Sequence, residues 1–201
     1  MAKQPFGAAK SDLWTAVVLG VLVIVGTLVT AVRRVIEIAP NQDVPVDVTV
    51  TPQQRPISID GVGEAVPVEL DSGTVIVSDL PVWSHLAALA AVVVPALAVI
   101  AVALCVAWLC RNLASGVFFS GTNTRLVTAT SLVILAGWLL TTVATTVAAN
   151  GAYRRLSDGS GEFEVTMDLS FFYLFVAMVV GCLAGAFRAG ERLQRDTAGL
   201  V

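Results

Sequence analysis

Residues 86–110 read LAALAAVVVPALAVIAVALCVAWLC and contain no Asp, Glu, Lys or Arg. An α-helix rises about 1.5 Å per residue, so this run exceeds the roughly 20 residues that cross about 30 Å of hydrocarbon. A buried helix of a water-soluble protein normally carries a polar stripe, and this run carries none. The stretch therefore predicts a membrane-spanning helix.

Three further runs, at 13–32, 126–149 and 169–187, are also free of these charged residues. The chain of 201 residues is 56% hydrophobic and only 13% charged, whereas soluble domains are about 25% charged. The first run is longer than the apolar core of a signal peptide, and no small-residue cleavage site follows it, so we interpret it as an uncleaved span. The sequence thus predicts a membrane α-helical protein with four transmembrane helices.

The distribution of charge predicts the orientation of these helices. With both termini in the cytoplasm, the inner segments carry seven of the 12 basic residues but only three of the 15 acidic residues. The positive-inside rule favours this arrangement in a cell membrane. The predicted organisation is a cytoplasmic N-terminus over 1–12, spans over 13–32, 85–110, 125–149 and 169–188, extracytoplasmic segments over 33–84 and 150–168, a cytoplasmic loop over 111–124 and a cytoplasmic tail over 189–201.

The two extracytoplasmic segments change from continuous to alternating hydrophobicity. Within 33–84, four short stretches alternate apolar with polar residues or are β-branched, at 44–50, 57–60, 66–70 and 74–77; a fifth alternating stretch covers 162–169. Alternation separated by turn residues is typical of short strands with one buried face. Because a single strand is unstable alone, we expect both segments to build one small extracytoplasmic β-module. Most of the acidic residues lie here.

Catalytic and metal-binding patterns are missing from the sequence. The three cysteines lie within predicted spans, and the only histidine, His85, stands beside Trp83 at the edge of a span without clustered ligands. No nucleophile elbow, zinc-protease motif or phosphate-binding loop occurs. We therefore expect no enzyme activity, no cofactor, no metal and no nucleic-acid binding.

Two features of the spans indicate helix packing. Ala177, Gly181, Gly185 and Ala189 recur at intervals of four residues, which predicts a small-residue face that lets another helix approach. Packing within this chain is the favoured interpretation, and an oligomer interface is the alternative. The threonines of the third span either line a polar path or bond their own helix, and the second reading is favoured because no ionisable residue accompanies them.

Two motifs at the inner ends of the spans resemble those of a family of small four-span bacterial membrane proteins that is catalogued as a domain of unknown function. The motifs are Gly116-x-x-Phe119-Ser120-x-x-Asn123-x-Arg125-Leu126 and Phe187-Arg188-x-Gly190-x-x-Leu193-Gln194. The order of spans is similar too. The resemblance implies partnership with a small cytoplasmic helix-turn-helix regulator, and it transfers no catalytic residue.

Four polar residues of these motifs are expected to meet at the inner face: Asn123, Arg125, Arg188 and Gln194. Such a cluster serves either as a binding surface or, as we favour, as a structural clasp of two helix ends. Ser120 or Asn123 can cap the third helix, and the arginines can reach lipid phosphates or helix carbonyls.

Three functions remain open on this evidence. The favoured one is a non-catalytic accessory subunit of a larger membrane complex, which contacts the lipid bilayer and binds a protein partner through the acidic outer module or a helix face. The second is a signal-responsive regulator that works with the helix-turn-helix protein. The third is a small transporter or channel, which the lack of charge within the spans disfavours.

Overall fold

The computed structural model describes residues 7–57, 66–157, 166–167 and 170–198. The element order is α1 (Gly7–Ile38), β1 (Val44–Ile57), β2 (Val66–Val77), α2 (Val82–Ala114), α3 (Gly121–Leu156) and α4 (Phe171–Ala198). Four helices, over Val17–Ile38, Val82–Ala114, Gly121–Leu156 and Phe171–Asp196, are long and apolar enough to cross a membrane. The membrane α-helical fold class predicted from the charge-free runs is therefore confirmed.

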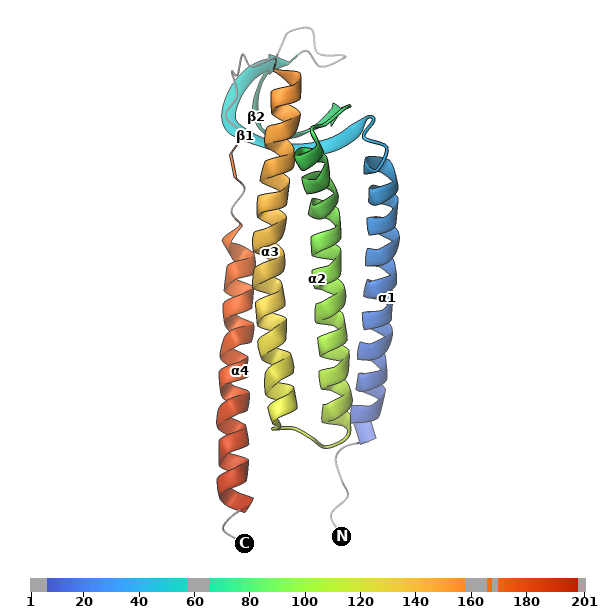
Figure 1. The fold of residues 1–201 in the computed structure, drawn as a ribbon. Coiled ribbons are helices and arrows are strands. Elements are labelled where there is room, and N and C mark those ends of the chain that lie inside the picture. Colours follow the sequence, from blue (N-terminus) through green and yellow to red (C-terminus); the bar gives the residue numbers. More distant parts are fainter. Residues whose placement is uncertain (1–6, 58–65, 158–165, 168–169, 199–201) are drawn as a thin grey trace. The chain divides into compact units, whose positions relative to one another are not determined.

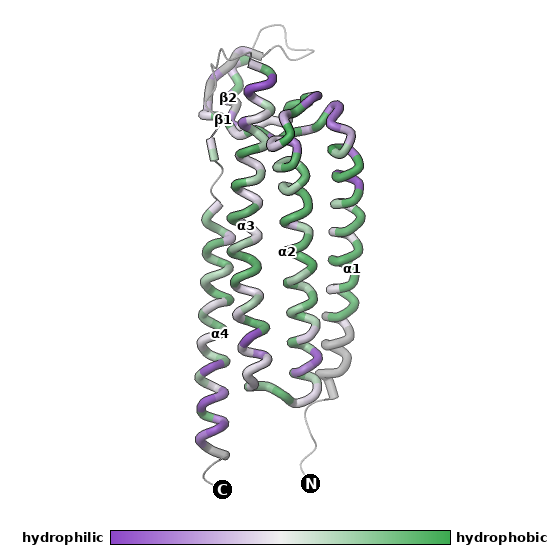
Figure 2. Tube along the Cα trace, viewed as in Figure 1, coloured by the Kyte–Doolittle hydropathy of each residue, from purple (hydrophilic) through white to green (hydrophobic). Residues whose placement is uncertain are grey.

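The helices extend beyond the charge-free runs on which they were predicted. Along each helix, Figure 2 shows a hydrophobic middle and more polar residues toward an end. At the end of α1, for example, Arg34 pairs with Glu37 one turn later at 3.3 Å. Charged residues at the edge of a bilayer do not stop a helix, because their backbone bonds are unaffected and their side chains reach water.

The described chain divides into two compact units. The hairpin unit comprises Arg33–Val93 and Leu140–Leu169, and therefore holds β1, β2, the end of α1, the start of α2 and the end of α3. The loop unit comprises the chain up to Val32, Val94–Leu139 and the chain from Ser170 onward. Within the loop unit, neighbouring helices run in opposite directions, and α3 lies between α2 and α4 (Figure 1).

The hairpin unit contains an antiparallel two-stranded sheet in which β1 pairs with β2 from Val44↔Val77 to Ile57↔Val66. The sequence predicts four short strands here. The structure extends the stretch at 44–50 to Ile57 in β1 and joins the stretches at 66–70 and 74–77 in β2, while residues 58–60 lie outside the described residues. The turn-like residues Asp71-Ser72-Gly73 do not end a strand, because residues 50–52 of β1 form a bulge opposite Asp71 and the pairing then resumes at Gln53↔Leu70. Pro52 lies in this bulge, where its missing N–H costs no ladder bond.

One face of the hairpin covers a hydrophobic core. The inward-facing residues Val44, Val46 and Val77 are 0%, 4% and 3% exposed, and they cluster with alanines of α2 and α3 such as Ala88 and Ala152. The small alanines let the sheet approach the helices closely. The predicted β-module is thus a packed unit rather than an unstructured linker.

The second segment that was predicted to be extracytoplasmic contributes one described contact to this module: the backbone N–H of Thr166 donates to the carbonyl oxygen of Thr49 at 3.0 Å. Residues 166–167 are not assigned to a strand. The rest of the alternating stretch predicted over 162–169 lies outside the described residues.

A clasp holds the two ends of the hairpin together where they join α1 and α2. The Asn41 side chain both donates to the carbonyl oxygen of Leu80 and accepts from its N–H, each at 3.1 Å. One turn into α2, His85 Nε2 lies 2.9 Å from the carbonyl oxygen of Ile38 at the end of α1. A carbonyl can only accept, so the Nε2 position carries the hydrogen. The Ile38 carbonyl oxygen also accepts from the N–H of Asn41 at 3.0 Å, so His85 is the second donor to this helix-end carbonyl.

Candidate interaction site at the loop between α2 and α3

Residues 115–120 connect α2 to α3, and Gly116 makes the turn possible. Its φ of +78° lies in the left-handed region, where other residues are strained. The N–H of Gly116 donates to the carbonyl oxygen of Leu113 at 3.0 Å, which ends α2 in the manner common for a glycine just past a helix.

Asn123 is the centre of this connection. It is 0% exposed, its Nδ2 donates to the carbonyl oxygens of Val117 and Phe118 at 2.7 and 2.9 Å, and its Oδ1 accepts from Asn112 Nδ2 at 2.7 Å. The Ser120 hydroxyl caps α3 by accepting from the N–H of Asn123 at 3.2 Å. A single buried amide thereby ties the loop to the last turn of α2 and the first turn of α3.

Phe119 fastens the same loop to α4. Its ring centroid lies 5.8 Å from that of Phe187 with a tilt of 58° between the planes. A Cβ added to Gly190 would overlap the Phe119 ring, so this position on α4 must stay small. The two motifs that carry the family resemblance therefore pack against each other, Phe119 from the first and Phe187 and Gly190 from the second.

Beside this contact, α3 and α4 enclose a pocket of about 470 Å³. Its charged lining residues are Arg125 on α3 and Arg188 and Glu191 on α4. The remaining lining residues, all on the first three turns of α3, are Gly121, Thr124, Thr128, Ala129 and Leu132. The lining changes from polar at the start of α3 to apolar further along it.

The side chain of Glu191, on α4, lies beside the first residue of α3. Its negative charge therefore faces the N-terminus of that helix. Its carboxylate oxygen would lie 3.5 Å from a Cβ built on Gly121, the first residue of α3. The exposed N–H groups at that end favour a negative charge. Arg195 pairs with the same carboxylate at 2.9 Å. Among the described residues, neither Arg125 nor Arg188 makes a hydrogen bond or ion pair, so the pocket keeps two unneutralised positive charges.

The structure separates the four residues expected to form one polar cluster. Arg125 and Arg188 do line a common pocket, whereas Asn123 points into the loop and is fully satisfied there. Gln194 is exposed on α4 and is not among the pocket-lining residues. Asn112, Thr124 and Glu191 are the participants that the sequence analysis missed.

The small-residue face of α4 also differs from the prediction. Ala177 is 3% exposed and its carbonyl oxygen accepts from Ser131 of α3 at 2.7 Å; a Cβ on Gly181 would lie 3.3 Å from the same hydroxyl. Gly185 has open space around it and Ala189 is exposed, so neither packs within the chain. A four-residue interval drifts by about 40° around a helix at each step, which turns the later positions away from α3. Ala184, 2% exposed, takes their place.

The threonines of α3 mostly bond their own helix. Thr145 and Thr146 donate to the carbonyl oxygen of Thr142 at 3.0 and 2.8 Å, as the favoured reading of the sequence expects. No group of three or more potential metal ligands occurs in the described parts of the chain.

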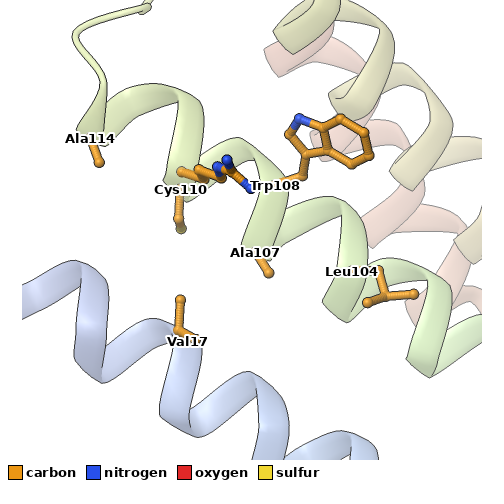
Figure 3. Close-up of a pocket in the computed structure, with 7 residues that line it drawn as sticks. Val17, Leu104, Ala107, Trp108, Cys110 and Ala114 are labelled. Atoms are coloured by element: carbon orange, nitrogen blue, oxygen red, sulfur yellow. The ribbon is translucent and has the colours of Figure 1, made fainter.

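A second pocket, of about 490 Å³, lies between α1 and α2 within the loop unit. Figure 3 shows Val17 of α1 facing Ala107, Cys110 and Ala114 of α2 across an apolar gap. Only Arg111 contributes a charge to the lining.

Taken with their hydropathy, the four helices define a multi-pass membrane protein. Large apolar side chains such as Leu22 and Trp108, both 61% exposed, cover their surfaces, which water would penalise and lipid favours. The chain belongs to the family described as "Protein of unknown function (DUF2975)", whose model matches residues 56–199. Neither the curated proteins nor the solved structures contain a match.

Proposed function

We propose that this protein is a non-catalytic accessory subunit of a membrane complex, and that it binds a basic segment of a partner protein through the outward face of the β1–β2 hairpin. The observation that carries the proposal is the negative charge on the exposed surface of the hairpin. Asp47 lies on the outer face, whereas strand alternation puts Glu69 and Asp71 on the face of Val75 and Val77, where they are nevertheless exposed. Five exposed carboxylates border or occupy the hairpin: Asp43, Asp47, Glu69, Asp71 and Asp79.

Between Asp43 and Asp79 the sequence carries one basic residue, Arg55. The other arginines of the hairpin unit, Arg33, Arg34, Arg154 and Arg155, lie at the ends of α1 and α3. Of the five carboxylates, only Asp79 makes an ion pair within the described residues: it lies 3.8 Å from Arg155, and both side chains are more than half exposed. Asp47 accepts from the hydroxyl of Thr74 at 2.7 Å, a neutral bond that orients the carboxylate and leaves its charge in place. A surface of one sign attracts and orients a partner of the other sign.

The hairpin is also a firm support for such a surface. Asp47 and Thr74 stand opposite each other on the outer face, while their neighbours Val46 and Val75 pair on the inner face that packs on the core. Because the backbone is fixed by this core, little conformational entropy is lost when a partner binds. In the orientation favoured by the basic residues, the acidic face lies outside the cytoplasm of a bacterial cell and both termini lie inside.

The proposal is tested by crosslinking in intact membranes followed by purification in mild detergent. Replacing Asp47, Glu69 and Asp71 by their amides should reduce the crosslinked partner at least several-fold, and raising the salt concentration should weaken binding to the wild type. The matched control is Glu191→Gln, which removes one carboxylate from α4, outside the hairpin unit. Recovery of this chain alone at several expression levels, or retention of the same partner by the triple amide variant, would refute the proposal.

A second candidate function is a regulator that relays a signal to a cytoplasmic helix-turn-helix protein. It is supported by the family resemblance and by the basic, exposed end of α4, where Arg188, Arg192 and Arg195 follow one another. Deleting residues 41–80 should then change the transcription of neighbouring genes, and an unaltered transcript profile would remove this candidate.

A further inference from the structure

We propose that the pocket between α3 and α4 binds the head group of an anionic phospholipid, with the phosphate between Arg125 and Arg188 and an acyl chain along α3. This inference is independent of the acidic hairpin face. It rests on three properties of the pocket: its net charge, a buried hydroxyl without a partner, and the change in polarity along its length.

The charge of the pocket favours an anion. Glu191 is already paired with Arg195 at 2.9 Å, so its negative charge does not cancel those of Arg125 and Arg188. Arginine presents several N–H donors in a plane and binds phosphate through two of them at once. Two arginines from two helices can therefore hold one phosphate from both sides.

Thr124 supplies an observation of a different kind. The residue lines the pocket and is only 7% exposed, and its Oγ1 has no hydrogen-bond partner in the described part of the chain. The Thr128 hydroxyl donates to the backbone carbonyl oxygen of Thr124 at 2.8 Å, a bond that does not involve the Thr124 hydroxyl. A buried polar group without a partner costs about 1–3 kcal/mol. The Oγ1 atom has less than 1 Å² of accessible surface in the lipid-free pocket, so a phosphate or glycerol oxygen accepts its hydrogen once the Thr124 side chain turns toward the pocket.

The pocket also has the polarity of a phospholipid. Its charged residues lie at the start of α3 and at the facing part of α4, whereas Ala129 and Leu132 continue the wall toward the middle of the span. Leu132 is 60% exposed, which leaves apolar surface for an acyl chain. A soluble phosphate would use the polar end alone, but a phospholipid uses both.

Native mass spectrometry of the full-length protein in mild detergent tests the assignment. Palmitoyl-oleoyl phosphatidylglycerol should bind at least about tenfold more tightly than the matching phosphatidylcholine, because both lipids offer the same phosphate but the choline group adds a positive charge that the two arginines repel. Arg125→Gln with Arg188→Gln should abolish this preference, and the two lysine replacements should retain part of it. The matched control is Arg154→Gln with Arg155→Gln, which removes the same charge from the other end of α3.

Thr124→Val separates binding from folding. The valine keeps the shape of threonine without the unsatisfied hydroxyl, so the lipid-free protein should melt at the same or a higher temperature while phosphatidylglycerol binds several-fold more weakly. Equal binding of the two lipids, or equal phosphatidylglycerol binding by the wild type, the double glutamine variant and Thr124→Val, would overturn the proposal. Displacement of the lipid by micromolar inorganic phosphate would also overturn it, since the pocket would then belong to a soluble anion.

Discussion

Replacing Asn123 with leucine should destabilise the protein more than any other single polar substitution near the α2–α3 loop. The substitution removes three side-chain hydrogen bonds, to Val117, Phe118 and Asn112, at 2.7, 2.9 and 2.7 Å. Each contributes about 1 kcal/mol net, and a part-buried amide and two carbonyls lose their partner. The loop residues are exposed, so water can reach the carbonyls, and the total loss is about 2–4 kcal/mol.

Thermal unfolding of the purified protein in mild detergent measures this loss. For a chain of this size, about 3 kcal/mol corresponds to a fall in Tm of about 6–12 °C. The matched control is Asn150→Leu on the same helix, because Asn150 is exposed and bonds only the Thr146 carbonyl of its own helix at 2.8 Å. The control should change stability by less than about 0.5 kcal/mol. If Asn123→Leu lowers Tm no more than Asn150→Leu, Asn123 does not hold the loop and the reasoning fails.

Three further substitutions test the hairpin unit by the same assay. Gly151→Ala places a Cβ on the side chain of Ser84 and should cost about 1–3 kcal/mol, and adding Ser84→Gly should restore the wild-type Tm if the clash is the cause. Val44→Ala should cost about 1–2.5 kcal/mol because Val44 is 0% exposed, whereas Ile76→Ala, at a position 66% exposed, should cost little; equal losses would contradict the observed packing of the sheet. His85→Phe should cost about 1 kcal/mol by removing the bond to the end of α1, and an unchanged Tm would show that this bond adds no stability.

The helices were predictable because a segment that crosses the hydrocarbon of a bilayer must be long and free of charge, and both properties can be read from the segment alone. A run of residues without charge, such as 86–110, satisfies both requirements without reference to the rest of the chain. The alternating valines at 44, 46 and 48 likewise predict a strand with one buried face, and the structure confirms that all three are buried. The alternation does not show which strand pairs with which, so the bulge opposite Asp71 and the joining of the stretches at 66–70 and 74–77 into β2 were missed.

The site was harder to predict because its contacts join residues that are distant in the sequence. The residues around Asn123 in the sequence predict that it caps a helix. They do not show that its side chain bonds Asn112 in the preceding helix. In the sequence, Glu191 is one charged residue among several in the C-terminal segment. Only the structure shows that its carboxylate lies beside Gly121 at the start of α3. Arg125 and Arg188 were expected at the same membrane face, because Arg125 directly precedes the charge-free run 126–149 and Arg188 directly follows the run 169–187.

Labelling from one side of the membrane examines the arrangement on which all of these inferences depend. With Cys105, Cys110 and Cys182 replaced, single cysteines are introduced at Ile76 in the hairpin and at Phe118 in the α2–α3 loop, both of which are exposed. An impermeant maleimide applied to intact cells should modify Ile76→Cys and leave Phe118→Cys unmodified until the membrane is opened. Modification of both positions from the same side, or release of the protein from carbonate-washed membranes, would contradict the four-span structure.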